Sequence, residues 1–232
     1  MKTLQSQPSG LPRPPGHVDI FTTRFADLPD DCRILSNAEK ERASRFVRKS
    51  DAARYRTGRA WMRRRIAAVL GVSPGGLPLA AGPHGKPELP GHPVHFNLTH
   101  TEEEAWLAIS ASPVGIDLEL PPAGDLEPLF RQIASPEEWR HAGTHGITVE
   151  RFLLLWTAKE AVLKLLGTGL MADPRSFTLG PLDTPGPRCL VIDGRQICLQ
   201  RLPARRGAAA HVAATGDSLE IRLHGPQGGT VF

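Results

Sequence analysis

Three carboxylates in two short motifs could form one metal site. Asp117 and Glu119 lie two residues apart in the run 114–120, and Glu160 ends the sequence Trp-Thr-Ala-Lys-Glu. Side chains alternate across a strand, so a strand at 114–120 would place Asp117 and Glu119 on one face. Two carboxylates side by side on one face of a strand repel each other unless a cation offsets their charge. The ordinary alternative for such a pair is the solvated face of a strand.

Basic side chains near these motifs are of the types that bind phosphates. Lys159 falls within the apolar stripe of a predicted helix, where an ammonium is costly unless it meets an anion. Lys164 lies four residues after Glu160 and could equally form an ordinary helix ion pair with it. His100 stands between two threonines and could be a structural histidine, and Lys86 could be a solvated loop lysine.

As a set, these residues indicate phosphoryl chemistry on a pyrophosphate. Mg²⁺ prefers one or two carboxylates, several waters and the phosphate oxygens of a substrate, and lysines and histidine suit the remaining charge. The sequence contains no P-loop, no G-x-G-x-x-G run, no Ser-His-Asp order and no zinc spacing. Residue types alone therefore lead to a magnesium-dependent site for a diphosphate and no further.

The elements that must position these residues predict a mixed α+β fold. Apolar residues recur at helical spacing in 37–70 and 149–166, and these runs end at Gly71 and Gly167. A shorter helix is predicted at 126–134, followed by a capping box at 135–138 that begins another. Helix followed by strands occurs twice, on either side of about residue 121. The predicted strands are 95–98, 105–110, 114–120, 177–179, 188–192, 196–202, 211–215 and 219–223.

Length and composition limit the number of domains and the cellular compartment that can be expected for the protein. A chain of 232 residues leaves one large domain or two small ones. No apolar run approaches the ~18 residues of a membrane span, and the N-terminus lacks the apolar stretch of a signal peptide, so a cytosolic protein is expected. Residues 1–16 are proline-rich and are expected to form a disordered or draped arm. Cys32, Cys189 and Cys198 fit no metal spacing and are expected to be small buried apolar residues without a disulfide.

Basic residues are concentrated in one segment of the chain. The net charge is only +4, yet Arg42–Arg65 contains ten lysines or arginines against one acid. Such a local excess of positive charge indicates an anionic partner. On the predicted helix, Arg54 and Arg65 flank the apolar face on one side, and Arg56, Arg59 and Arg63 flank it on the other.

Four blocks of sequence occur in a characteristic order. They are Gly85-Lys86-Pro87, 96–101 (Phe-Asn-Leu-Thr-His-Thr), 114–119 (Val-Gly-Ile-Asp-Leu-Glu) and 156–170, which contains Lys159, Glu160, Lys164 and Gly-Thr-Gly. Their order and spacing resemble the 4′-phosphopantetheinyl transferases, specifically the long, monomeric type that activates peptide and polyketide synthetases. The resemblance runs from about residue 37 to about residue 180. Thr99 and Thr101 stand where serines are commoner in that family.

The resemblance implies a fold and a reaction. The fold would be α+β, with two similar halves at 17–120 and 121–232 related by a pseudo-two-fold axis and with coenzyme A in the cleft between them. A serine hydroxyl of an apo carrier protein would attack the β-phosphorus of coenzyme A in the presence of Mg²⁺ and release 3′,5′-ADP, as in a holo-acyl-carrier-protein synthase. The carriers would be those of peptide, polyketide or fatty acid synthases. The protein would act as a cytoplasmic monomer, without nucleic acid or membrane.

Carried over position by position, the resemblance also implies residue roles. Mg²⁺ would be held by Asp117, Glu119 and Glu160, and the catalytic residues would be Glu160, Glu119 and Lys164. Lys159 and Lys164 would meet the phosphates. The serine proton would go to a carboxylate of the site, directly or through a water, and the sequence does not choose among Glu119, Glu160 and water. The rest of coenzyme A would be bound by Arg54, Lys86, Thr99, His100 and Thr101, with Arg42 a looser match.

Two other functions stay open at this point. A basic nucleic-acid-binding module would use Arg42–Arg65, but it leaves the three carboxylates unexplained, and a single tyrosine gives little stacking surface. A magnesium-dependent phosphohydrolase would use the same carboxylates. If the protein is a transferase, Arg56, Arg59 and Arg63 are left for solvent or for the acidic surface of a carrier protein.

Overall fold

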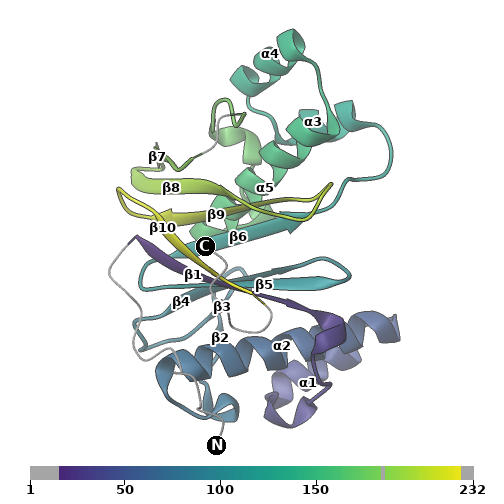
Figure 1. Cartoon of the computed structure of the whole chain (residues 1–232), viewed down its shortest axis with the longest axis vertical. Coiled ribbons are helices and arrows are strands. Elements are labelled where there is room, and N and C mark those ends of the chain that lie inside the picture. The colour runs from purple at the N-terminus through teal and green to yellow at the C-terminus, as the bar shows by residue number, and fades with distance from the viewer. Residues whose placement is uncertain (1–15, 184–185, 226–232) are drawn as a thin grey trace, which may run out of the picture.

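The computed structural model describes residues 16–183 and 186–225, which form two four-stranded sheets and a small two-stranded one. Figure 1 shows the two larger sheets between two outer layers of helices. The arm predicted at 1–16 lies outside the described residues except for Gly16. Within the described ranges, no helix is long and apolar enough to cross a membrane.

The first large sheet is covered by the long helix α2 (Lys49–Leu70). Its strand order is β10-β1-β5-β4, and β1 (His17–Arg24) pairs in parallel with β10 (Glu220–His224). The strands β4 (His95–His100) and β5 (Glu104–Ser110) form an antiparallel pair. Met62 and Ile66 of α2 are fully buried in the core beneath this sheet. The remaining elements of this half are α1 (Asn37–Ser44), β2 (Ala80–Ala81), β3 (Pro87–Glu88) and the 3₁₀ turns η1 (Phe25–Asp27), η2 (Cys32–Ile34) and η3 (Pro74–Gly76).

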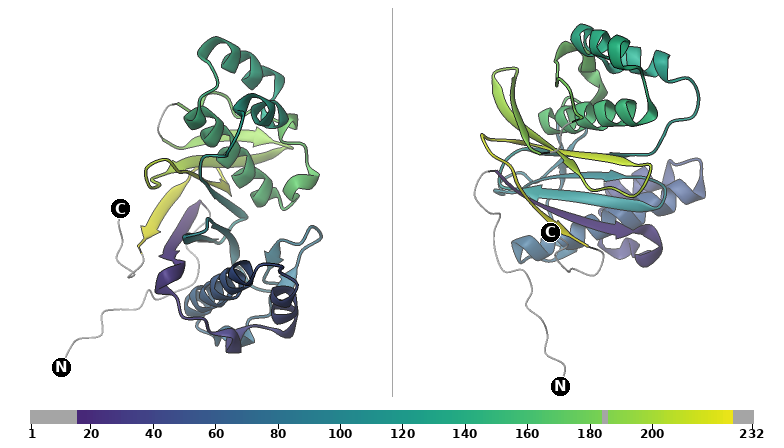
Figure 2. Two further views of the ribbon diagram at one scale, coloured as in Figure 1. Left: turned by 90° about the vertical axis from the view of Figure 1, so that its right-hand side faces the viewer. Right: turned by 45° about the horizontal axis from the view of Figure 1, so that its top comes forward.

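The second large sheet is covered by the helix α5 (Val149–Leu166). Its antiparallel strand order is β6-β9-β8-β7, where β6 is Val114–Glu119, β9 is Ala209–Thr215, β8 is Arg195–Leu202 and β7 is Arg188–Ile192. The helices α3 (Leu126–Ile133) and α4 (Pro136–His145) lie at the far end of the molecule from α2, as both views of Figure 2 show. Two 3₁₀ turns, η4 (Gly169–Met171) and η5 (Pro174–Ser176), follow α5.

The helix α5 lies directly on β6 because position 115 is a glycine. A Cβ built on Gly115 would overlap the carbonyl oxygen of Ala161 and the amide nitrogen of Leu165. The backbone of α5 therefore touches the strand that carries Asp117. At its end, Gly167 adopts the left-handed conformation (φ 75°) that closes a helix.

The edge strands of the two large sheets, β4 and β6, are joined by side chains. Asn97 Oδ1 accepts a hydrogen bond from the Ile116 amide at 2.8 Å, and Thr99 Oγ1 accepts one from the Leu118 amide at 3.3 Å. Polar side chains of β4 thus accept hydrogen bonds from two backbone amides on the edge of β6 that pairs with no other strand of its sheet. This joint brings Thr99, near the end of β4, next to Asp117.

The mixed helix-and-sheet class is confirmed, but several elements differ from their predictions. The helix predicted at 37–70 is two helices, because Arg48 takes an extended backbone as the N-cap of α2. The segment 177–179 is not a strand, since its backbone groups pair with the side chains of Glu138 and Lys159. The strand β1 has no counterpart in the prediction. Strand pairing also crosses the boundary expected at 120–121, because β6 belongs to the second sheet and β10 to the first.

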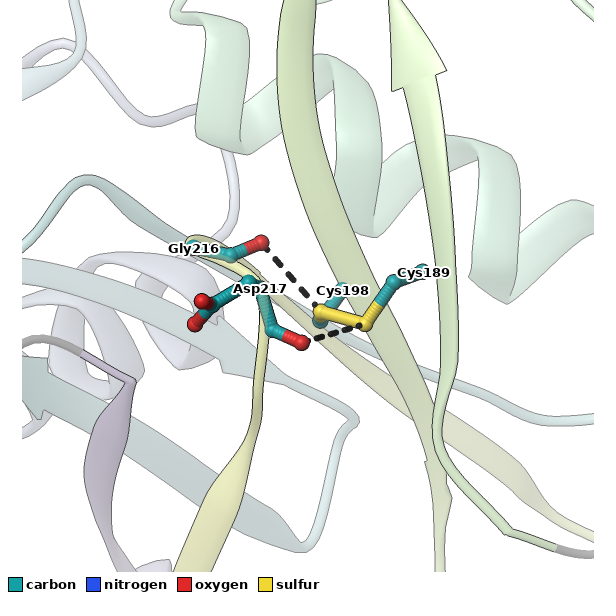
Figure 3. The surroundings of a disulfide bond; sticks show 4 residues. All are labelled: Cys189, Cys198, Gly216 and Asp217. Carbon is teal, nitrogen blue, oxygen red and sulfur yellow. Dashed lines mark hydrogen bonds between the residues drawn. A yellow bond between two sulfur atoms is a disulfide. The ribbon is translucent and has the colours of Figure 1, made fainter.

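The prediction for the cysteines is wrong. Cys189 of β7 and Cys198 of β8 form a disulfide, shown in Figure 3 beside the carbonyl groups of Gly216 and Asp217. The hairpin register places the two residues directly opposite each other, with their Cα atoms 4.0 Å apart. Their sequence separation does not reveal this until the register is known. Cys189 is exposed and Cys32 is half-buried, so of the three only Cys198 is a small buried residue.

Candidate active site

Asp117 lies at the centre of a polar cluster between β4, β6 and α5. The residue is buried, and its Oδ1 accepts hydrogen bonds from Lys164 Nζ at 2.5 Å and from Thr99 Oγ1 at 3.3 Å. Its Oδ2 is also buried but has no hydrogen-bond partner among the residues that the structure describes. A buried carboxylate oxygen without a partner is costly, so a donor or a cation is expected there.

Glu160 of α5 and Glu119 of β6 add two more carboxyl groups to this cluster. Burial and the charge of Asp117 raise the pKa of both, that of Glu119 to about 7, and Lys164 opposes the shift in each case. Glu160 Oε1 is buried and unpartnered, like Asp117 Oδ2. Three carboxyl groups therefore share a single ammonium, and the charge of Asp117 makes ionisation of the other two more costly. We call Asp117, Glu119 and Glu160 the acidic cluster.

The acidic cluster suits Mg²⁺ although it is not a closed cage. In the part of the chain that the structure describes, no three Asp, Glu, His or Cys side chains are arranged as a ready metal site. Mg²⁺ needs only one or two protein carboxylates and completes its shell with waters and substrate phosphates. The unpartnered oxygens of Asp117 and Glu160 provide such a pair. This donor set therefore suits a magnesium ion that binds together with a phosphate.

A cavity of about 230 Å³ lies between α2 and the end of β4. Its basic lining comes from Arg42, Arg54 and Arg59, and its apolar lining includes Phe96. His100, an exposed residue at the end of β4, also lines it, and partial desolvation together with the positive charges of Arg54 and Lys164 lowers the pKa of this histidine. His100 is therefore the link between the basic cavity and the acidic cluster. We call this space the basic cavity.

Lys86 lies where the first half of the chain meets the end of α5. Its Nζ donates hydrogen bonds to the carbonyl oxygens of Val114 at 3.0 Å and Lys164 at 2.6 Å, with that of Leu165 at 3.5 Å. Burial lowers the pKa of this ammonium to about 8. The structure thus brings Lys86 close to Lys164, but as a cap on the last turn of α5.

The two threonines beside His100 also have protein partners. Thr99 Oγ1 binds Asp117, and Thr101 Oγ1 accepts hydrogen bonds from the amides of Glu103 and Glu104 at 3.2 Å and 3.3 Å. Thr101 thereby shapes the turn between β4 and β5. The hydroxyl that lies against the acidic cluster is that of Thr99.

Lys159 is not brought to the acidic cluster. Its Nζ forms an ion pair with Glu138 at 2.8 Å and donates to the carbonyls of Pro174 at 2.7 Å and Phe177 at 2.5 Å. An ammonium has three N–H donors, and these three acceptors use them all. Burial lowers the pKa of Lys159, and Glu138 partly opposes that shift. The anion that the apolar stripe requires is the Glu138 carboxylate rather than a phosphate.

The arginines expected on the outer flank of α2 are not a free surface. Arg63 is 1% exposed and binds Glu39 at 2.8 Å and the carbonyls of Pro74 and Leu77 at 3.0 Å and 3.3 Å. Arg59 is mostly buried and lies 3.5 Å from Glu39, and Arg56 pairs with Asp30 at 2.9 Å. The idea that this flank meets a carrier protein is wrong for Arg63, because a charge buried in this way cannot contact a partner.

Two residues that matter to the site have no role in the sequence prediction. Glu138 is the third residue of α4, where its Oε2 accepts from the Ser135 amide at 2.8 Å and closes a capping box. The capping box is visible in the sequence, but the pairing of Glu138 with Lys159 is not. Trp156 gives Glu119 a hydrogen bond that partly offsets the rise of its pKa.

Acid should destabilise the protein through His211. The ring is buried on β9, 2.8 Å from Thr157 Oγ1, and burial together with the charge of Arg201 lowers its pKa from 6.5 to about 3. Between these values the unfolded chain binds more protons than the folded one, so stability is lost as the pH falls. The free energy of unfolding should fall by up to about 1.4 kcal/mol per pH unit in that window.

Urea unfolding between about pH 7 and pH 4 checks this expectation against the variant His211→Gln. The variant should show a shallower pH dependence than the native protein. Parallel curves for the two proteins would contradict it.

Family models and individual relatives match the chain. The model of the 4′-phosphopantetheinyl transferase superfamily matches residues 113–215, and the model of the 4′-phosphopantetheinyl transferase N-terminal region matches residues 24–113. The chain belongs to the 4′-phosphopantetheinyl transferase superfamily. A phosphopantetheinyl transferase of Thraustochytrium is 31% identical over an alignment of 241 positions. The alignment spans 88% of this chain and 83% of that protein.

Two bacterial relatives of this transferase cover different shares of its length. A 4′-phosphopantetheinyl transferase of Bacillus subtilis is 29% identical over 188 residues, 78% of this chain and 84% of that protein. One from Aneurinibacillus migulanus is 32% identical over 149 residues, 62% of each chain. The two matched family segments meet at residue 113, between β5 and β6. The acidic cluster lies in the second segment and the basic cavity in the first, so both segments contribute to the candidate site.

Proposed function

We propose that this transferase moves the 4′-phosphopantetheine group from coenzyme A to a serine of apo carrier proteins, with Mg²⁺, and releases 3′,5′-ADP. The observation that carries the proposal is the pair of buried, unpartnered carboxylate oxygens on Asp117 and Glu160, beside a cavity lined by arginines. The unpartnered carboxylate oxygens suit a cation, and the arginine-lined cavity suits a phosphate-rich ligand. Family membership and this pairing of features support the same reaction.

The acidic cluster and its lysine would act on the diphosphate. Asp117, Glu119 and Glu160 would hold Mg²⁺, which would supply polarisation of the diphosphate and neutralisation of its charge. Lys164, which binds Asp117, and His100, whose pKa the charge of Lys164 helps to lower, would take up charge on the leaving phosphate. Catalysis of this kind consists mainly of positioning and charge neutralisation.

The 3′-phosphate and adenine end of coenzyme A would occupy the basic cavity. Arg54 and Arg42 supply charge there, and the cavity's apolar side suits a purine ring. Lys86 Nζ already donates hydrogen bonds to the carbonyl oxygens of Val114 and Lys164. It would bind a phosphate of coenzyme A only by giving up one of these hydrogen bonds. Thr99 and Thr101 would act by holding Asp117 and the β4–β5 turn.

The attacking serine must lose its proton, and a carboxylate of the acidic cluster, Glu119 or Glu160, would accept it directly or through a water. Burial and the charge of Asp117 raise the pKa of both carboxyls, that of Glu119 to about 7. The serine would come from an acyl, peptidyl or aryl carrier domain of a peptide, polyketide or fatty acid synthase. We further propose that one cytoplasmic monomer performs the reaction.

We also propose that the two halves are related by a pseudo-two-fold axis and divide near residue 113. One arrangement occurs in both. Arg63 and Lys159 each lie eight residues before the left-handed glycine that ends α2 or α5. Each pairs with a glutamate that is the third residue of a helix capped by a serine. Each also donates hydrogen bonds to two backbone carbonyls, that of a proline and that of the third residue after it. We call Arg63, Glu39, Pro74 and Leu77 the α2 latch, and Lys159, Glu138, Pro174 and Phe177 the α5 latch.

Mass spectrometry of an apo carrier protein tests the proposed function. Incubation with the transferase, coenzyme A and Mg²⁺ should add one phosphopantetheine group to the carrier, and chelation of the metal should prevent this. A phosphohydrolase would instead consume coenzyme A without a carrier protein. An unmodified carrier with intact coenzyme A would contradict the proposal.

Arg54→Ala should weaken coenzyme A binding by roughly tenfold or more, because a charge-assisted hydrogen bond contributes about 1.5–3 kcal/mol. Arg54 lines the basic cavity and is held by Asp51 at 2.6 Å. Calorimetric titration with coenzyme A measures the change. Arg56→Ala is the matched control, since Arg56 lies on the same helix but pairs with Asp30 outside the cavity. Equal losses in the two variants would remove Arg54 from the binding site.

A further inference from the structure

The α5 latch fixes the helix on the side opposite to its contact with β6. Lys159 and Ala161 are two residues apart, which places them about 200° apart around the helix axis. The Ala161 backbone touches Gly115, while Lys159 points to Glu138 of α4 and to the carbonyls around η5. The helix is thus held from two opposite sides. Glu160 lies between these two contacts in the sequence.

The glutamate of this latch is fully occupied. Glu138 Oε2 binds the Ser135 amide and Lys159, and its Oε1 accepts from the Leu179 amide at 2.7 Å. The ammonium of Lys159 also lies 4.6 Å from the centre of the Phe177 ring. A buried ion pair whose hydrogen bonds are all made has one favourable geometry, so it resists rotation of α5 about its axis.

Rotation of α5 would separate the groups of the acidic cluster. Glu160 and Lys164 are four residues apart on one face, and Lys164 reaches Asp117 at 2.5 Å. A side chain about 5–6 Å from the helix axis moves by about 2 Å when the helix turns by about 20°. Such a movement would break the Lys164–Asp117 hydrogen bond and part the two unpartnered carboxylate oxygens.

We propose that the α5 latch positions the acidic cluster, and that Lys159 is a positioning residue rather than a phosphate ligand. The inference rests on the proposed function, since it assigns the metal-binding geometry to the latch. It predicts that removing the latch weakens metal binding even though no latch residue touches the acidic cluster. Partners outside a metal's own ligands change metal affinity by roughly 10- to 100-fold in general.

The test replaces both charges of the latch at once. In Glu138→Gln with Lys159→Met, no buried charge is left without a partner, so the variant should fold. Its affinity for Mn²⁺ at saturating coenzyme A, measured by electron paramagnetic resonance, should fall by roughly 10- to 100-fold. If that variant does not fold, Lys159→Arg keeps the buried ion pair but replaces the ammonium that fits its three acceptors, and it should show a smaller loss in the same direction. Native affinity in a folded variant would overturn the proposal.

The α2 latch supplies a matched control. Glu39→Gln with Arg63→Met removes a buried pair of the same geometry, but α2 carries none of the acidic cluster. Its thermal midpoint should change by about as much as that of the α5 variant. Its Mn²⁺ affinity should stay within about twofold of the native value, because this pair is remote from the proposed ligands. An equal loss of Mn²⁺ affinity in this control would show that general destabilisation, and not position, is responsible.

A crystal structure of the α5 variant separates this inference from the proposed function. Absence of Mn²⁺ binding in the native protein would refute the metal site itself. The distance between Lys164 Nζ and Asp117 Oδ1 in the variant would still decide the role of the latch. We expect that distance to exceed hydrogen-bonding range, and an unchanged contact would overturn the inference.

Discussion

Asp117→Ala is expected to lower the rate of transfer by more than about 100-fold, because even partners behind a metal's ligands change activity by 10- to 100-fold. The carboxylate receives Lys164 and Thr99 on one oxygen and keeps the other buried and unpartnered. Removing it takes away one of the two oxygens that suit Mg²⁺. It also leaves Lys164 without the acceptor that holds it in place.

The same variant should stay folded. Asp117 raises the pKa of both Glu119 and Glu160, so its removal relieves repulsion within the acidic cluster. The measurement is the initial rate of carrier modification across a Mg²⁺ titration, with circular dichroism to verify the fold. Glu127→Ala serves as the control, because Glu127 is an exposed acid that pairs only with Arg131 of its own helix. Near-normal turnover by a folded Asp117→Ala protein at any Mg²⁺ concentration would refute the proposed site.

Elements with local signals could be predicted from the sequence, and elements set by distant pairing could not. The helix α5 begins and ends where predicted, because its apolar spacing and its Gly167 end are both local features. The strand β1 was missed, since its partners are β5 and the distant β10. The same limit explains the disulfide: Cys189 and Cys198 meet only through the hairpin register.

In the candidate site too, side chains in local motifs could be predicted, and their partners in distant elements could not. The motifs around Asp117, Glu160 and Lys164 indicated one cluster, and the structure brings these three side chains together, although their roles stay predictions. Lys159 needs an anion, as its place in the apolar stripe predicts, because a buried ammonium is costly. The identity of that anion depends on how α4 packs against α5. The sequence showed Glu138 only as a capping residue.

Gly115→Ala is expected to destabilise the protein by about 3 kcal/mol or more, as overpacking in a close-packed interior does. The new Cβ would overlap the backbone of α5 at Ala161 and Leu165 and would lie 3.0 Å from the Lys164 carbonyl carbon. Helix backbone cannot rotate away as a flexible side chain would. The helix must instead move off β6, against the α5 latch on its other side. The thermal midpoint should fall by roughly 6–12 °C for a chain of this size.

The loss of activity in Gly115→Ala should exceed what its stability alone explains. When α5 moves, Lys164 and Glu160 move away from Asp117, so transfer should fall even well below the thermal midpoint, where the protein is folded. Gly143→Ala is the control, because Gly143 lies in the helix α4 and an added Cβ meets nothing within 4 Å. That variant should be as stable as the native protein or more stable by up to about 1 kcal/mol, since alanine favours a helix over glycine. If Gly115→Ala matched Gly143→Ala in both melting and turnover, the direct contact between α5 and β6 would not be what holds the acidic cluster together.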